Sequence, residues 1–384
     1  MRLLQVTRFG LAVGGLSFAL NVATAAFAQP APSAPAPPPA YGQPSENEFV
    51  IHDFHFRSGE TLPELRIHYT TLGTPARDAS GRITNAVLVL HGTGGEGHSL
   101  IRPQFAGELF GPGQLLDDSR FFIILPDDIG HGKSSKPSDG MHMRFPRYEY
   151  SDMVEAEHRL VAEHLGISRL RLIMGTSMGC MHAFMWGELY PQGMDALMPL
   201  ACTPDPIAGR NRLWRRMVID VIEHDPAWNG GDYTSEPLEG LRGAEDIQII
   251  AGSAPQQMLK VLTNNAEVDA YLKHYMDLDL GGPGADPKDL LDADDLIYQV
   301  DSSRDYDASA NLEAIEAPVM WINSADDFIN PPELPIADHE APRLRKGRFV
   351  LLPIGPNTHC HGTHTWAVAW KNYLYQLLEE SGPL

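Results

Sequence analysis

A serine held between two glycines offers the clearest chemistry in this sequence. Ser177 lies in the segment Gly175-Thr176-Ser177-Met178-Gly179, which has the pattern G-x-S-x-G and follows an apolar run. Where such a segment joins a strand to a helix, its glycines permit a strained turn that exposes the serine hydroxyl at the helix N-terminus. The sequence therefore predicts that Ser177 is the nucleophile of an acyl-transfer reaction.

Two acids are candidates for the carboxylate that such a nucleophile needs. A serine hydroxyl reacts only when a histidine removes its proton and a carboxylate orients that histidine. Asp326 and Asp327 follow the apolar run 318–322, in a loop at the end of a predicted strand. We predict Asp327 as the catalytic acid, because an acid followed by two apolar residues and then a proline recurs at this point of such folds. Asp326 is the alternative, and would otherwise hydrogen-bond the loop backbone.

Three histidines near the C-terminus are candidates for the general base. His359 and His361 lie in the loop 355–362, directly after the apolar run 349–352. A catalytic histidine belongs on such a loop, after the acid in chain order. We predict His361 as the base, with His359 as the alternative. His364 falls in the first turn of the last predicted helix, where we expect it to cap that helix or to pack locally.

A glycine-rich loop is expected to complete the site. The negatively charged oxygen of a tetrahedral intermediate needs backbone N–H donors. One is expected from the residue after the nucleophile, Met178, and the other from the loop His91-Gly92-Thr93-Gly94-Gly95, where Thr93 is the predicted donor. The alternative is an ordinary glycine-rich turn. Phosphate binding is disfavoured, because no Lys-Ser/Thr ending follows.

Short apolar runs separated by helical stretches predict the framework that positions these residues. Such runs are typical of strands buried on both faces of a parallel sheet. They occur at 86–90, 121–125, 170–174, 196–201, 318–322 and 349–352. Alternation at 64–69 predicts early antiparallel strands, and helices are expected at 152–165, after Ser177, and at 364–380. This order predicts an α/β protein with a mostly parallel, doubly wound sheet.

Changes in composition divide the chain into four parts. Residues 1–28 carry two arginines around the start of an apolar run and end in Ala-Phe-Ala, which predicts a cleaved signal peptide and an exported, periplasmic or extracellular enzyme. The Pro/Ala-rich residues 29–46 predict a linker. Residues 47–203 and 316–384 form the predicted core. Residues 204–315 are too many for an ordinary crossover, and we expect an inserted helical cap there.

The chain is strongly acidic. Fifty acidic against 29 basic residues give a net charge of -21. Such a charge repels nucleic acid and anionic membrane surfaces, and no stretch beyond the signal peptide approaches the apolar length of a spanning helix. We therefore expect a small neutral or cationic acyl substrate as the partner, with no nucleic acid and no membrane. The sequence leaves a homodimer open.

The cysteines give no sign of a cross-linked or metal-binding scaffold. Cys180, Cys202 and Cys360 are too few and too scattered for a disulfide framework or a zinc site. We expect them to be small buried apolar residues, although one pair could oxidise in an exported protein. The expected chemistry uses neither a metal nor an organic cofactor, and none is predicted.

Three segments resemble the homoserine O-acetyltransferase family of the α/β-hydrolase superfamily, and especially its hydrolase-like branch. They are the run from Tyr150 to Tyr190, the segment Asp225-Pro226-Ala227-Trp228-Asn229-Gly230-Gly231, and the segment Cys360-His361-Gly362-Thr363-His364-Thr365-Trp366. The resemblance covers about residues 48–380. It implies the α/β-hydrolase fold with an inserted helical cap.

Two positions depart from the transferases of that family. An acid usually follows the catalytic histidine in them, whereas this chain has Gly362. Ile219 stands at the spacing of their substrate-binding cap arginine, with Arg215 and Arg216 about one turn earlier. An exported enzyme would also lack acetyl-CoA. We therefore expect a secreted serine hydrolase that acts on an ester or related acyl compound through an acyl-Ser177 intermediate. The alternatives are an O-acyltransferase of the homoserine O-acetyltransferase type and a catalytically silent binding protein.

Overall fold

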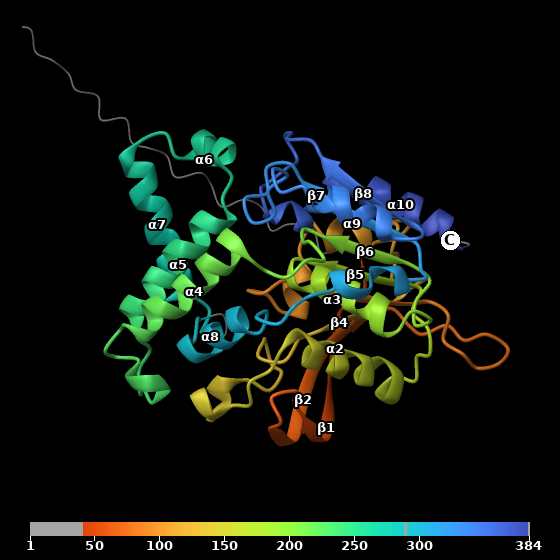
Figure 1. Cartoon of the computed structure of the whole chain (residues 1–384), viewed down its shortest axis with the longest axis horizontal. Coiled ribbons are helices and arrows are strands. Elements are labelled where there is room, and N and C mark those ends of the chain that lie inside the picture. Colours follow the sequence, from red (N-terminus) through yellow and green to blue (C-terminus); the bar gives the residue numbers. More distant parts are fainter. Residues whose placement is uncertain (1–40, 288–289, 383–384) are drawn as a thin grey trace, which may run out of the picture. The chain divides into compact units, whose positions relative to one another are not determined.

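A mostly parallel sheet of eight strands forms the centre of the protein (Figure 1). The computed structural model describes residues 41–287 and 290–382. The strand order is β1-β2-β4-β3-β5-β6-β7-β8, with β2 antiparallel to both β1 and β4 and the other pairs parallel. The strands are β1 (Ser45–His55), β2 (Thr61–Leu72), β3 (Ala86–Leu90), β4 (Phe122–Pro126), β5 (Leu172–Thr176), β6 (Leu197–Leu200), β7 (Val319–Ser324) and β8 (Gly347–Leu352). The predicted sheet is therefore confirmed.

Side chains of the central strands feed two separate apolar cores. Along β3, Leu88 and Leu90 join one buried cluster, whereas Val87 and Val89 join the other. Because successive side chains of a strand point to opposite faces, a continuous apolar run is what a sheet covered on both faces requires.

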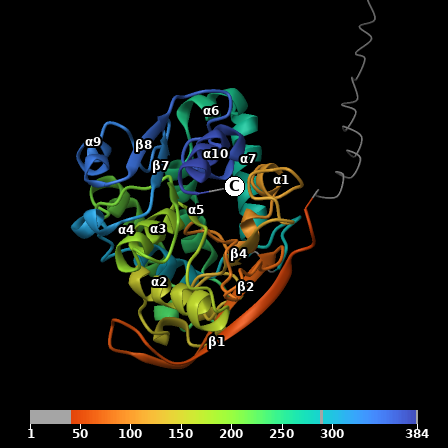
Figure 2. The ribbon, with the colours of Figure 1, turned by 90° about the vertical axis from the view of Figure 1, so that its right-hand side faces the viewer.

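Helices cover both faces of the sheet. The α-helices are α1 (Ala106–Leu109), α2 (Tyr150–Arg159), α3 (Met178–Leu189), α4 (Gly209–Glu223), α5 (Leu238–Gly252), α6 (Pro255–Val261), α7 (Asn265–Asp279), α8 (Ala293–Asp301), α9 (Ile336–Glu340) and α10 (Lys371–Glu380). Residues of α2 and α3 belong to the first core cluster, and residues of α1 and α10 belong to the second. Figure 2 shows α2 and α3 apart from α1 and α10, with the long hairpin of β1 and β2 at one edge. The doubly wound α/β-hydrolase architecture is thus the one that the sequence predicts.

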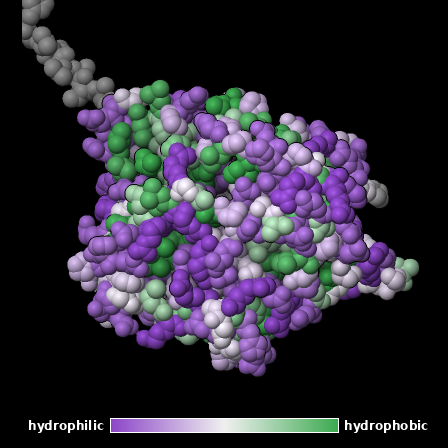
Figure 3. All heavy atoms as spheres, in the orientation of Figure 1, coloured by the Kyte–Doolittle hydropathy of each residue, from purple (hydrophilic) through white to green (hydrophobic). Residues whose placement is uncertain are grey.

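The segment between β6 and β7 is helical and has an apolar core of its own. Helices α4, α5 and α8 pack around Val218, Ile222, Leu241, Leu296 and Val300, all of which are buried. We call this segment, with α6 and α7, the cap. Its outer surface carries large exposed apolar side chains, which gather on one side of the face seen in Figure 3. The large apolar side chains of the cap that are exposed include Leu213, Met217, Ile250, Leu259 and Val261, and the first three line a pocket together with Phe328 and Ile329.

The ends of the chain differ in detail from the sequence prediction. The expected signal peptide and residues 29–40 of the expected linker lie outside the described residues. Residues 41–46, which were predicted as part of the linker, belong to the folded protein, because Tyr41 is buried against Phe110 and strand β1 begins at Ser45. The last helix begins at Lys371 rather than near His364, since residues 362–369 form short 3₁₀ turns. No helix among the described residues is long and apolar enough to cross a membrane.

Candidate active site

Ser177 occupies a strained turn between β5 and α3. Its backbone φ is 53° and its ψ is -106°, a conformation that an L-residue rarely adopts. The turn is also crowded. A Cβ on Gly175 would overlap the carbonyl of Gly179, and a Cβ on Gly179 would overlap the carbonyl of Leu90. Glycine at both positions is therefore a steric requirement, and it explains why the segment has the pattern G-x-S-x-G.

The structure brings Ser177, His361 and Asp327 together in one hydrogen-bonded chain. The Nε2 atom of His361 lies 2.8 Å from the Ser177 Oγ, and its Nδ1 lies 2.9 Å from the Asp327 Oδ2. Asp327 comes from the loop after β7, and His361 from the loop after β8. These loops meet because the strands are parallel neighbours, so their carboxyl ends share one edge of the sheet.

The Asp327 carboxylate is buried and held in its ionised form. One oxygen accepts the backbone N–H groups of Ile329 and Asn330, at 2.8 and 3.1 Å. The other accepts the Asn330 side-chain amide at 3.1 Å, in addition to His361. Burial alone would raise the pKa of Asp327, but His361 and the Asn330 donors outweigh it and lower this pKa. The group can therefore stabilise a positive charge on His361 without taking its proton.

The alternative residues have other partners. Asp326 accepts the Ser324 hydroxyl and the Cys360 N–H, so it braces the histidine loop. His359 stacks on Trp366, with ring centroids 3.8 Å apart. His364 packs edge-on against His361 at 5.1 Å, and burial lowers its pKa to about 3. Neither His359 nor His364 makes a hydrogen bond to Ser177.

The two residues predicted as oxyanion donors lie close to Ser177. Met178 is the first residue of α3, where a backbone N–H has no acceptor within the helix. Gly92 packs against Ser177 so closely that a Cβ on it would lie 3.3 Å from the Ser177 Cβ. Thr93 follows Gly92 directly. The N–H of Gly179 is already bonded to the His91 carbonyl at 2.9 Å, which ties the glycine-rich loop to the nucleophile turn.

A cavity of about 980 Å³ lies between the cap and the core, next to these loops. Gly94, Gly95 and His359 line its core side. Its walls hold more acids than bases: Glu96, Glu245, Asp279, Asp292 and Asp295 against Arg102 and Lys136. This lining suits neutral or cationic groups better than anionic ones.

One cap arginine turns inward. Arg215 is only 3% exposed, and its Nε donates to the Asn211 Oδ1 at 3.1 Å. Its Nη1 makes no hydrogen bond within the described residues, although the Tyr150 hydroxyl lies close to the guanidinium. Arg216, by contrast, is exposed and pairs with Glu223. The sequence left open whether Arg215 or Arg216 turns inward. In the structure both lie on helix α4, and Arg215 is the one on its buried side.

A buried polar cluster under α3 contains the residue types that bind metal ions. Asp128, Glu157 and His182 place ligand atoms within 4.8 Å of one another. The His182 ring lies 2.8 Å from Glu157, and the Trp186 indole N–H donates to the same carboxylate. Burial raises the pKa of Asp128 to about 8 and that of Glu157 to about 7. Glu157 is thus held by His182 and Trp186, and we assign the cluster no role in holding an ion.

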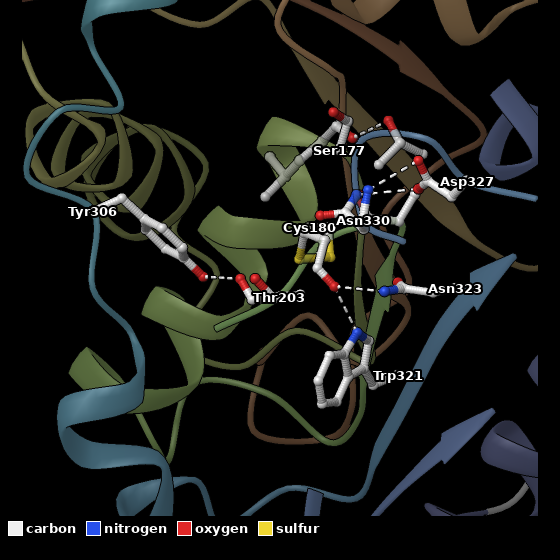
Figure 4. The surroundings of a disulfide bond; sticks show 12 residues. Ser177, Cys180, Thr203, Tyr306, Trp321, Asn323, Asp327 and Asn330 are labelled. Atoms are coloured by element: carbon white, nitrogen blue, oxygen red, sulfur yellow. Dashed lines mark hydrogen bonds between the residues drawn. A yellow bond between two sulfur atoms is a disulfide. The ribbon is translucent and has the colours of Figure 1, made fainter. Parts of the chain in front are cut away.

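A disulfide beside the site was not predicted. Cys180 and Cys202 are bonded, with their Cα atoms 5.8 Å apart. The expectation of small buried apolar cysteines therefore holds for Cys360 and is wrong for the other two, which form the pair that the sequence left open. In Figure 4, Trp321 and Asn323 both point at the Cys202 carbonyl, to which they donate at 2.8 and 3.0 Å.

The chain is similar to known proteins over most of its length. The α/β-hydrolase fold family matches residues 85–351. A homoserine O-acetyltransferase of Geotalea uraniireducens is 30% identical, over 75% of this chain and 84% of that protein. Among solved structures, the homoserine O-acetyltransferase of Bacillus anthracis has a TM-score of 0.75 and 19% identity, covering 87% of this chain and 97% of that one. An acetylester hydrolase of Corynebacterium glutamicum has a TM-score of 0.74 and 21% identity, covering 87% of this chain and 96% of that one. The chain therefore belongs to the α/β-hydrolase superfamily and, within it, to the homoserine O-acetyltransferase-like family.

Proposed function

We propose that this enzyme is a serine hydrolase of carboxylic esters or related acyl compounds, and that it acts through an acyl-Ser177 intermediate. The observation that carries the proposal is the hydrogen-bonded chain from the Ser177 Oγ through His361 to Asp327. Three such groups in this order are what nucleophilic acyl transfer requires, and binding alone has no need of them. A catalytically silent binding protein is therefore the weakest of the three alternatives.

Each group has a step in the proposed reaction. His361 Nε2 takes the Ser177 proton as Oγ attacks the acyl carbon, and Asp327 stabilises the resulting imidazolium. The N–H groups of Met178 and Thr93 hold the negative oxygen of the tetrahedral intermediate. His361 then gives its proton to the leaving alcohol. Water, deprotonated by the same histidine, then attacks the acyl carbon, the bond to the Ser177 Oγ breaks, and His361 returns the proton to Oγ as the acid leaves.

The features around the site favour water as the final acceptor. Gly362 follows His361, so no carboxylate stands there to pair with the ammonium group of an amino-acid acceptor. The cavity of about 980 Å³, which Gly94, Gly95 and His359 of the neighbouring loops line, has room for water.

Acyl transfer to an alcohol is the second candidate, and the inward-turned Arg215 favours it. The Arg215 guanidinium is buried and its Nη1 makes no hydrogen bond within the described residues, so this nitrogen can donate to a carboxylate. Acceptors of the homoserine type carry a carboxylate. The same Ser177, His361 and Asp327 would serve both reactions, so only the acyl acceptor differs.

One experiment separates the two candidates. The purified protein is incubated with a panel of acyl esters, and separately with acetyl-CoA and homoserine, while acid release and free thiol release are followed. We expect ester hydrolysis that Ser177→Ala abolishes, with thiol release near background. Homoserine-dependent thiol release at about 10⁴ M⁻¹s⁻¹ or more would assign the transferase instead.

We also propose that the enzyme is exported and loses its first 28 residues. The Cys180–Cys202 disulfide supports this, because such bonds persist mainly in oxidising compartments. N-terminal sequencing of the protein recovered from the periplasm or medium should find Gln29 at or near its start. Recovery of the intact chain from the cytoplasm would count against export.

A further inference from the structure

Two buried histidines lie against the glycine-rich loop and have no part in the proposed reaction steps. His91 directly follows β3, and His131 lies in the loop after β4. Both rings are at most 1% exposed, and their centroids are 5.0 Å apart. Neither makes a hydrogen bond to Ser177, His361 or Asp327. Their contacts instead converge on the two peptide groups that flank Thr93.

His91 fixes the peptide group before Thr93. Its Nε2 accepts the backbone N–H of Asp128 at 3.1 Å, and since a backbone N–H can only donate, the His91 proton must reside on Nδ1. That Nδ1–H donates to the Gly92 carbonyl at 2.8 Å. The N–H of Gly95 donates to the same carbonyl at 2.9 Å. Two donors therefore hold this oxygen in one direction.

The orientation of the Thr93 N–H follows from this contact. In a trans peptide the N–H points opposite to the carbonyl of the same peptide plane, and none of the described peptide bonds is cis. The Thr93 N–H is therefore directed away from His91. Gly92 is the residue that packs on Ser177, so this peptide group lies beside the nucleophile.

His131 fixes the peptide group after Thr93. Its Nε2 lies 2.8 Å from the Thr93 carbonyl, and its Nδ1 lies 3.0 Å from the Ile129 carbonyl. Burial lowers the pKa of His131 to about 3, so the ring is neutral and donates to only one of the two. With its proton on Nε2, the ring donates to the Thr93 carbonyl, and this is the tautomer that the proposal below uses. The peptide groups before and after Thr93 are then each held by a histidine side chain.

We propose that His91 and His131 are positioning residues that orient the Thr93 N–H toward the reacting oxygen. They act through the backbone and touch neither substrate nor nucleophile. The inference rests on the proposed function, because an oriented donor matters only if an oxyanion forms at Ser177. Removing one oxyanion donor typically lowers kcat by about 10² to 10³.

The two histidines donate from different ring nitrogens, and this gives a crossed test. The amide nitrogen of asparagine reaches the place of Nδ1, whereas that of glutamine reaches the place of Nε2. His91→Asn should therefore keep kcat within about threefold, while His91→Gln should lower it by about 10². At position 131 the order reverses: His131→Gln should keep kcat within about threefold, and His131→Asn should lower it by about 10². KM should change little in all four variants.

A second measurement reports on the oxyanion itself. A trifluoromethyl ketone forms a tetrahedral adduct with the serine, so its affinity should fall in parallel with kcat/KM across the four variants. His158→Gln serves as the control, because His158 stacks on Tyr190 at 3.8 Å, away from the nucleophile turn. Melting temperatures identify any variant that fails to fold.

The outcomes separate this inference from the proposed function. If the wild-type protein shows no Ser177-dependent ester hydrolysis, the proposed function fails. If the wild type is active but Asn and Gln have equal effects at both positions, the positioning role is overturned. Unchanged ketone affinity in a variant with impaired kcat would overturn it as well.

Discussion

Cys180, one turn into the nucleophile helix, is disulfide-bonded to Cys202, just beyond the end of β6. The same β6 end supports the acid loop, because the Asn330 amide donates both to the Ala201 carbonyl and to Asp327, at 3.0 and 3.1 Å. The cross-link therefore joins the element that carries the serine to the backbone that anchors the acid.

Replacing both bonded cysteines by serine should destabilise the enzyme. The bond closes a loop of 22 residues, and a loop of that size contributes about 3 kcal/mol to the free energy of unfolding. Urea denaturation of the double variant Cys180→Ser/Cys202→Ser should show this loss. Cys360→Ser is the matched control, since Cys360 is free and buried. Equal midpoints for all three proteins would contradict the prediction.

Substitutions in the hydrogen-bonded chain should affect catalysis far more than substitutions of the alternative residues. His361→Ala and Asp327→Asn should each lower kcat by a factor on the order of 10⁴. Asp326→Asn and His359→Ala should be much milder, because these groups brace the loop and stack on Trp366. Ester hydrolysis under saturating substrate measures the effect. If the milder pair proves the damaging one, the loop residues have been assigned to the wrong roles.

The buried acids Asp128 and Glu157 should make stability depend on pH. Burial raises the pKa of both carboxyls, and Asp128 also faces the charge of Glu157. The folded protein thus keeps protons that the unfolded chain releases above about pH 4, so the stability gained from this pair is lost as pH rises through the folded-state pKa values. Asp128→Asn should flatten the decline in unfolding free energy between about pH 4 and pH 8, because the pKa of Asp128 is about 8 in the folded protein. Parallel curves for variant and wild type would contradict this assignment.

Alanine at Gly175 or Gly179 should prevent formation of the nucleophile turn. Each added methyl would overlap a backbone carbonyl, which cannot move aside as a flexible side chain can. We expect both variants to be poorly folded or inactive. Gly252→Ala is the control, since no atom lies within 4 Å of the added carbon and the residue ends a helix. Circular dichroism and fluorophosphonate labelling of Ser177 measure fold and site together.

Local patterns predicted most of the sheet and the residues that meet at the site. The run 86–90 is buried on both faces, so its composition alone distinguishes it from an exposed strand. Ser177 was predictable because its turn requires glycine at positions 175 and 179, and these two glycines can be recognised in the sequence. Asp327 and His361 were less so, since each has a similar neighbour and the choice depends on how two loops meet in space.

Contacts between distant segments explain what local patterns missed. Cys180 and Cys202 bond because α3 and β6 lie side by side in the folded chain. The last helix was predicted to begin near His364 because Trp366 fits a helical spacing. In the structure Trp366 instead stacks on His359, and the backbone around it forms tight turns.

The independent core of the cap has a consequence for how this enzyme can diversify. Helices α4, α5 and α8 bury their apolar residues against one another, while the nucleophile, acid and histidine all sit on loops of the sheet. The cap enters after β6 and returns before β7, so a replacement would need only two splice points. A related cap grafted at these points should therefore change which acyl compounds the protein accepts, while Ser177, His361 and Asp327 keep their places on the sheet.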